Sequence, residues 1–124
     1  MSAVESARGQ RRQHVLLLAE LDQFQLLLDT YGHFAADEAL KQFADRLQAR
    51  LPAGSAIARI GTNEFAALLA DQPIARGLDL ARELGEALRK SPLRWQERPF
   101  DLTAAIGVAT VSDITVDGAS ALAA

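Results

Sequence analysis

The chain has 124 residues, 49% hydrophobic and 23% charged, a balance that predicts one globular domain with a hydrophobic core. The net charge of −3 argues against a protein that binds a nucleic-acid backbone, although magnesium could still neutralise the phosphates of a nucleotide. The absence of cysteine excludes disulfides and thiolate metal sites. No apolar run approaches the ~20 residues that span a bilayer, and we expect a cytoplasmic domain.

The N-terminal half predicts a tail, a strand and two helices. Residues 1–13 are polar, without the apolar core of a signal peptide, and predict a flexible tail. The apolar run 15–19 predicts a strand buried on both faces. A helix follows, with Gly32 as its C-terminal cap. The second helix carries apolar residues at intervals of three and four, namely Leu40, Phe43, Ala44, Leu47 and Leu51.

The C-terminal half predicts a hairpin, a third helix and further strands. Two apolar runs around a polar turn predict a β-hairpin at about 56–70, and a third helix opens at Pro73. Its apolar face is predicted to consist of Ile74, Leu78, Ala81, Leu84 and Leu88. Residues 93–95 predict a short edge strand, and alternation predicts a strand over 100–108. Residues 118–124 predict the start of another helix.

This order of elements predicts an α/β fold of the α+β type, with a central mixed, largely antiparallel sheet flanked by helices. Glu20 and Asp22 follow the first strand, whereas Asn63 and Glu64 lie in the hairpin turn. If the two strands are neighbours, these four side chains converge at one edge of the sheet. Carboxylates at such an edge hold two metal ions in a polymerase palm. The alternative is that Glu20 and Asp22 are solvated acids at a strand end.

Three segments together resemble a GGDEF domain, the diguanylate cyclase domain. The first contains LLAELDQF at 17–24, followed by DTYGH and DEAL. The second, ARIGTNEF at 58–65, resembles the signature turn, and the third, AIGVA at 105–109, resembles a strand that follows the third helix. The resemblance covers about 15–110 and implies a nucleotidyl-cyclase fold over 14–124. It also implies an activity in which two domains, each with GTP and magnesium, make cyclic di-GMP.

The resemblance implies roles for the residues that match the motifs. It implies a vestigial metal site at Glu20 and Glu64, with Glu20 one methylene longer than the aspartate of the family. The implied nucleotide-binding positions are Phe24, Asp37, Gly61 and Thr62. Asp37 is equally explained as a first-turn helix acid favoured by the helix dipole. Arg59 has two explanations, a structural cation or a phosphate ligand.

Other positions depart from the family pattern. Asn63 replaces an acid that binds metal, and a neutral amide ligates magnesium poorly and cannot accept a proton. Thr62 replaces a glycine at a position where φ can be positive, which suits a β-branched residue poorly. Leu28 replaces an asparagine that reads guanine, and Gln25 replaces a lysine that faces phosphate. Residues 52–55 lack the charged motif of an inhibitory product site, and the chain ends before the last helix of the family.

These departures favour a catalytically degenerate GGDEF domain with no catalytic residue that we would assign with confidence, Asn63 and Glu64 being the degenerate positions. Such a domain would act as a regulatory or protein-interaction module in bacterial cyclic di-GMP signalling, beside an EAL phosphodiesterase domain or another protein partner. The first alternative is a sensor that binds GTP and magnesium without turnover. The second is a weakly active cyclase that makes cyclic di-GMP from two GTP. Magnesium is expected only if nucleotide binding is retained.

Overall fold

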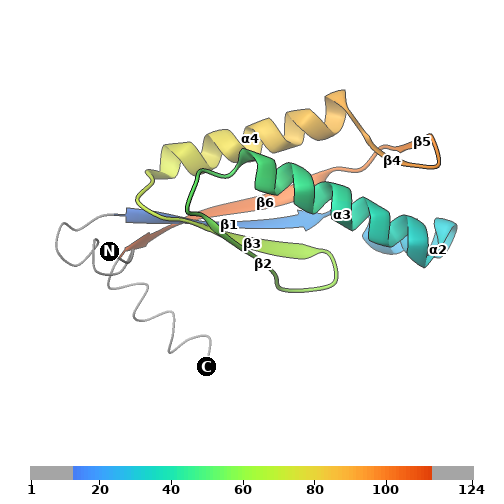
Figure 1. Cartoon of the computed structure of the whole chain (residues 1–124), viewed down its shortest axis with the longest axis horizontal. Coiled ribbons are helices and arrows are strands. Elements are labelled where there is room, and N and C mark those ends of the chain that lie inside the picture. Colours follow the sequence, from blue (N-terminus) through green and yellow to red (C-terminus); the bar gives the residue numbers. More distant parts are fainter. Residues whose placement is uncertain (1–12, 113–124) are drawn as a thin grey trace.

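The computed structural model describes residues 13–112, which form six strands and three helices (Figure 1). The strands are β1 (Gln13–Leu21), β2 (Ala56–Arg59), β3 (Glu64–Leu69), β4 (Leu93–Trp95), β5 (Arg98–Phe100) and β6 (Ala104–Ser112). The helices are α2 (Phe24–Tyr31), α3 (His33–Arg50) and α4 (Ile74–Lys90). The helix predicted at 118–124 and residues 1–12 of the predicted tail lie outside the described residues, whereas Gln13 already belongs to β1.

Four strands form one sheet in the order β2-β3-β1-β6, and every pairing in it is antiparallel. Helices α3 and α4 lie across one face of this sheet, and α2 lies near one end of α3 (Figure 1). The arrangement confirms the predicted α/β fold with helices packed on an antiparallel sheet. None of the three described helices is long and apolar enough to cross a bilayer.

From Val15 onward, the central strand β1 is fully buried on one face only. Val15, Leu17, Ala19 and Leu21 are at most 2% exposed and belong to the core beneath the helices. On the other face, the Leu18 side chain is 43% exposed and Glu20 is exposed. The prediction of a strand buried on both faces was therefore wrong, because among residues 13–112 helices cover one face of the sheet.

The buried face of helix α4 agrees with the prediction at Leu84 and Leu88 but differs from it toward the start of the helix. Its buried residues are Gly77, Leu80, Leu84 and Leu88, whereas Leu78 is 56% exposed. At Gly77 an added Cβ would lie 2.6 Å from Cγ1 of Val15 and 2.7 Å from Cγ1 of Val108, so the helix backbone packs directly against β1 and β6. The prediction missed this contact because a glycine contributes nothing to an apolar pattern.

The segment between α4 and the last strand also differs from the prediction. Residues 93–95 form β4, which pairs with β5 in a separate two-stranded sheet rather than at the edge of the main sheet. Phe100 belongs to β5, and β6 begins only at Ala104. The sequence did not indicate the gap between β5 and β6, because its apolar alternation continues from Phe100 through Leu102. The predicted cap at Gly32 is confirmed, since its N–H donates to the Leu28 carbonyl at 2.9 Å with φ 89°.

Candidate functional site

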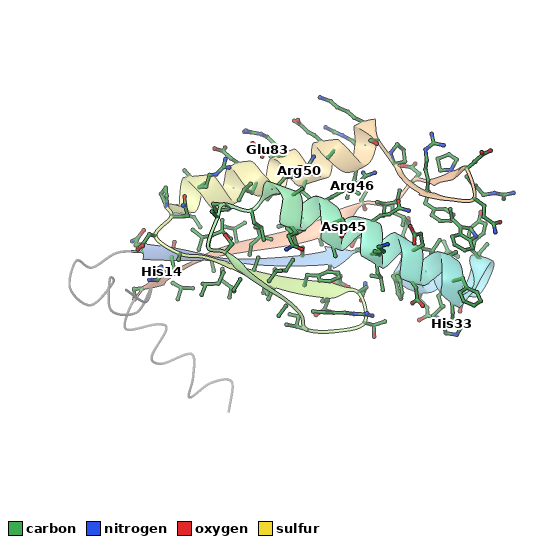
Figure 2. All side chains as sticks on the ribbon, viewed as in Figure 1. His14, His33, Asp45, Arg46, Arg50 and Glu83 are labelled. Atoms are coloured by element: carbon green, nitrogen blue, oxygen red, sulfur yellow. The ribbon has the colours of Figure 1, made fainter. Side chains whose placement is uncertain are left out.

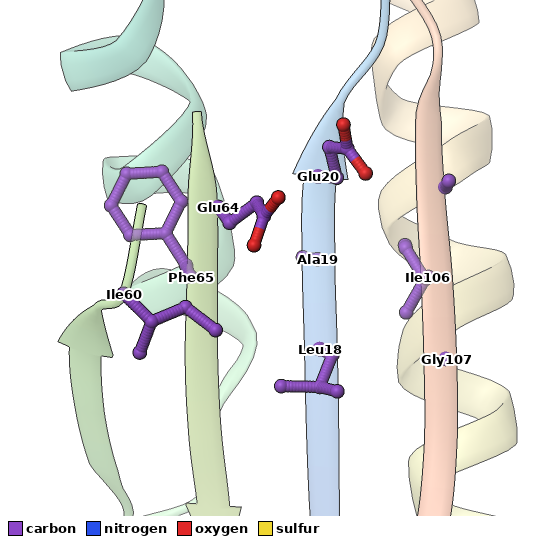
Figure 3. A pocket seen from close by; sticks show the side chains of 9 residues that line it. Leu18, Ala19, Glu20, Ile60, Glu64, Phe65, Ile106 and Gly107 are labelled. Atoms are coloured by element: carbon purple, nitrogen blue, oxygen red, sulfur yellow. The ribbon is translucent and has the colours of Figure 1, made fainter. Parts of the chain in front are cut away.

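Two carboxylates face the same side of neighbouring strands at one end of the sheet. Glu20 on β1 and Glu64 on β3 are direct partners in the antiparallel register. Both line a 420 Å³ cavity together with Leu18, Ile60 and the residues of β6 around Ile106 (Figure 3). Neither carboxylate has a hydrogen-bond or ion-pair partner in the part of the chain that the structure describes. The predicted convergence of Glu20 and Glu64 is therefore present in the fold.

Asn63 lies one position beyond this pair and ties the turn to β1. The Leu21 N–H donates to the Asn63 carbonyl at 3.0 Å. In return, the side-chain Nδ2 of Asn63 donates to the Leu21 carbonyl at 2.7 Å. A regular antiparallel pair would use two backbone donors. Here the side chain supplies the second donor at the point where β3 turns away from β1.

The remaining turn residues are held from the β2 side. The Arg59 guanidinium donates through Nε to the Gly61 carbonyl at 3.0 Å and through a terminal nitrogen to the Thr62 carbonyl. The Ile60 N–H donates to the Glu64 carbonyl at 2.9 Å. Arg59 is thus a structural cation of the turn, which agrees with one of its two predicted roles.

Thr62 does not strain the turn. Among the described residues, the non-glycine positions with positive φ are Gln23, Asp71, Gln96 and Glu97, and neither Gly61 nor Thr62 has a positive φ. A positive φ, one of the two reasons to expect a poor fit of a β-branched residue at this position, is therefore not present at Thr62.

Asp22 does not join the turn. Its N–H donates to the Thr103 carbonyl, and its carboxylate accepts a hydrogen bond from the Thr103 hydroxyl, both at 2.8 Å. Thr103 lies just before β6, on the side of β1 opposite to β3. The four predicted side chains therefore divide into a group at the turn (Glu20, Asn63, Glu64) and a separate Asp22–Thr103 pair.

The predicted nucleotide positions also lie in more than one place. Asp37 is exposed and lines a second cavity, of 360 Å³, together with Lys41 and Arg59. Phe65 lines both this cavity and the one at the carboxylates, so the two cavities are neighbours that share this residue. Phe24 is 7% exposed and belongs to the hydrophobic core. Roles for Phe24, Asp37, Gly61 and Thr62 in nucleotide binding stay predictions.

The residues at the turn do not fit a magnesium ion as they stand. Magnesium needs near-octahedral oxygen ligands. Residues 13–112 contain no group of three or more acidic, histidine or cysteine side chains that could hold a metal. The Leu21 carbonyl, a further oxygen at the end of β1, already accepts a hydrogen bond from the Asn63 amide. The carboxylates of Glu20 and Glu64 are therefore the two side-chain groups at the turn that could bind the ion.

Sequence reasoning missed two partners of this site, Thr103 and the Leu21 carbonyl. No side-chain pattern marks a carbonyl as a partner. The hydroxyl of Thr103 could not be recognised as a partner of Asp22, because the sequence pattern placed Thr103 inside a predicted strand, whereas β6 begins only at Ala104.

Comparisons with known proteins agree with this geometry. The chain is 31% identical over 107 residues to the probable diguanylate cyclase DgcF of Escherichia coli, a match that spans 86% of this chain and 34% of DgcF. It is also 31% identical over 107 residues to MucR of Pseudomonas aeruginosa, a bifunctional diguanylate cyclase and cyclic di-GMP phosphodiesterase, covering 86% of this chain and 16% of MucR.

Among solved structures, the fold is similar to that of the GGDEF domain of TpbB from Pseudomonas aeruginosa. The two superpose with a TM-score of 0.81 at 30% identity, covering 87% of this chain and 63% of that one. The model of the family described as "Diguanylate cyclase, GGDEF domain" matches residues 1–123. With that match and the paired acids at its signature turn, the chain belongs to the GGDEF domain family.

Proposed function

We propose that this GGDEF domain does not turn over GTP and acts as a regulatory or protein-interaction module in cyclic di-GMP signalling. The single observation that carries the proposal is the hydrogen bond from the Asn63 amide to the Leu21 carbonyl at 2.7 Å. It places a neutral, bonded amide where a third carboxylate would be needed. Cyclases of the family depend on magnesium, and two acids without a third oxygen ligand bind magnesium weakly.

The nucleotide side of the site supports the same proposal. Leu28 has no polar atom for a guanine edge, and a site that loses such a hydrogen bond loses much of its discrimination. Gln25 is engaged with Asp29, one helical turn away, through Nε2 and Oδ1 at 2.9 Å. The Gln25 side chain is also neutral, so it provides no positive charge for a phosphate. Each loss of an electrostatic contributor costs roughly 10²–10³ in rate.

A neighbouring domain is the proposed partner. The chain spans about a third of DgcF and a sixth of MucR, and MucR combines a diguanylate cyclase with a cyclic di-GMP phosphodiesterase. We therefore place this domain beside an EAL phosphodiesterase domain or another signalling protein whose activity it adjusts. The activity and the partners of the whole protein are part of what we propose.

One observation favours a second candidate, a GTP sensor without turnover. The exposed Asp37 shares its 360 Å³ cavity with the cations Lys41 and Arg59, and the cavity adjoins the unpaired Glu20 and Glu64 across Phe65. A nucleotide could use these groups without the full metal site. A weakly active cyclase is the remaining alternative, and it would need Glu64 to take over from Asn63.

A turnover assay tests the proposal. The full-length protein is incubated with GTP and MgCl2, and cyclic di-GMP is measured by mass spectrometry beside the double variant Thr62→Gly/Asn63→Asp. The proposal expects no product from the wild-type protein. Formation of cyclic di-GMP by the wild type above the level of a control without protein would contradict it. Product from the double variant alone would identify the turn as the cause of the loss.

A further inference from the structure

We infer that the Asn63 amide takes the place of a cation at the signature turn, so that this one residue decides whether the turn depends on a divalent metal. The inference rests on the proposed function, because it explains why a domain without turnover keeps an ordered site. It starts from the mismatch between the residues at the turn and magnesium. Its readout is the stability of the fold, which turnover does not affect.

The hydrogen bonds around Asn63 carry the first step. Glu20 and Glu64 are paired in the register, and the next position along holds the two bonds between Leu21 and Asn63. The backbone bond from the Leu21 N–H to the Asn63 carbonyl needs no side chain. The second bond needs a donor on the side chain, because the chain has begun to turn and Nδ2, at 2.7 Å, is the atom that reaches the Leu21 carbonyl.

The second step follows from the chemistry of the isosteric acid. An ionised aspartate has the shape of asparagine but only acceptor oxygens. At position 63 its oxygen would face the Leu21 carbonyl oxygen and repel it. A divalent cation that binds both oxygens removes this repulsion. Carboxylate and carbonyl oxygens are also the ligands that magnesium prefers. The donor of the amide therefore does in this chain what a cation does between two oxygens.

The same substitution completes the ligand set. Asn63→Asp would add a third carboxylate beside the unpartnered Glu20 and Glu64 and would free the Leu21 carbonyl. The wild-type turn should therefore be indifferent to magnesium, whereas the turn of the Asn63→Asp variant should be weakened without magnesium and restored by it. The test measures thermal unfolding of the full-length protein with and without MgCl2, at constant ionic strength set with NaCl.

The expected shifts are large enough to measure. Without magnesium, Asn63→Asp should lower Tm by about 4–8 °C, the effect of losing one partly buried hydrogen bond. MgCl2 at about 10 mM should raise the Tm of this variant by about 5 °C if the site binds with a millimolar Kd. The wild-type Tm should change by less than about 1 °C, since no site is saturated.

Two control variants separate the hydrogen bond from the ligand. Asn63→Ala loses the amide without adding an oxygen, so its Tm should fall and stay insensitive to MgCl2. In Asn63→Asp/Glu20→Gln one carboxylate is removed, and the response to MgCl2 should disappear. If Asn63→Asp does not fold without a cation, folding on addition of MgCl2 and unfolding with EDTA support the inference.

The inference is overturned if MgCl2 leaves the Tm of Asn63→Asp unchanged, or if it raises the wild-type Tm equally. A variant that stays unfolded in MgCl2 also overturns it. The proposed function fails by a different measurement, the formation of cyclic di-GMP by the wild-type protein. Either result can therefore occur without the other.

Discussion

Gln42 of α3 pairs with Arg94 of β4 as a strand residue would. Its Nε2 donates to the Arg94 carbonyl at 2.8 Å, and its Oε1 accepts the Arg94 N–H at 2.9 Å. The outer edge of the small β4–β5 sheet is thereby attached to the helix layer (Figure 1). One side chain thus fixes a hairpin that the main sheet does not hold.

Removing this pair should loosen the hairpin. Gln42→Ala breaks the two neutral hydrogen bonds to Arg94 and a third from Nε2 to the Glu38 carboxylate, and we expect the free energy of unfolding to fall by about 1–2 kcal/mol. Chemical denaturation measures the change. Gln48→Ala, at an exposed position of the same helix, is the matched control and should change stability by less than about 0.5 kcal/mol. Equal losses in the two variants would contradict the pairing role of Gln42.

Arg46 should stabilise the C-terminal end of α4. Its guanidinium donates to the carbonyls of Ala87, in the last turn of α4, and of Ser91 and Pro92, which follow the helix. Figure 2 labels Arg46. Burial lowers the pKa of Arg46 below its ordinary value, and the neighbouring Arg50 lowers it further, yet the group stays charged at neutral pH.

The hydrogen bonds to these three carbonyls require the two terminal nitrogens of the guanidinium. Arg46→Lys keeps the charge but cannot reach three carbonyls at once, and we expect a loss of about 1–2 kcal/mol. Arg46→Ala should cost about 2–3 kcal/mol, since charged hydrogen bonds are lost. Denaturation midpoints give both values. A lysine variant as stable as the wild type would show that charge alone suffices.

Two glycines of α4 should respond in opposite directions to alanine. Gly77→Ala places a methyl group 2.6 Å from Val15 Cγ1 and 2.7 Å from Val108 Cγ1, and overpacking should cost about 1–3 kcal/mol despite the better helix propensity. Gly85→Ala meets nothing within 4 Å and should gain about 0.5–1 kcal/mol. Thermal unfolding of both variants checks the prediction. A stabilising Gly77→Ala would show that α4 can move away from the sheet.

The Arg59 side chain should keep the signature turn ordered. In Arg59→Ala the carbonyls of Gly61 and Thr62 lose their donor, so we expect faster amide exchange at residues 60–64 with little change in global stability. Hydrogen exchange followed by mass spectrometry measures this locally. Arg89→Ala, an exposed arginine on α4, serves as the control and should leave exchange in the turn unchanged.

Much of the fold followed from periodic signals. The amphipathic pattern of α3, the hairpin around the turn and the Gly32 cap all depend on neighbouring residues, and all three appear in the structure. The errors concern contacts between distant elements. Gly77 packs on the sheet without an apolar side chain, and β4 pairs with β5 rather than with the main sheet.

In the candidate site, too, one part could be predicted from the order of the strands and another part could not. That Glu20 and Glu64 meet could be predicted, because strand order places the end of β1 beside the hairpin turn. That Asp22 turns to Thr103, and that Asn63 bonds a backbone carbonyl, could not be predicted, since both depend on where a side chain points after the chain has folded.

The most direct measurement of the central claim is a calorimetric titration of GTP into the full-length protein, with and without MgCl2. A domain whose turn has no cation site should show no magnesium-dependent heat up to millimolar GTP. Micromolar binding that requires MgCl2 and is lost in Glu20→Ala would contradict the account. It would show that the two carboxylates hold a metal even with Asn63 beside them.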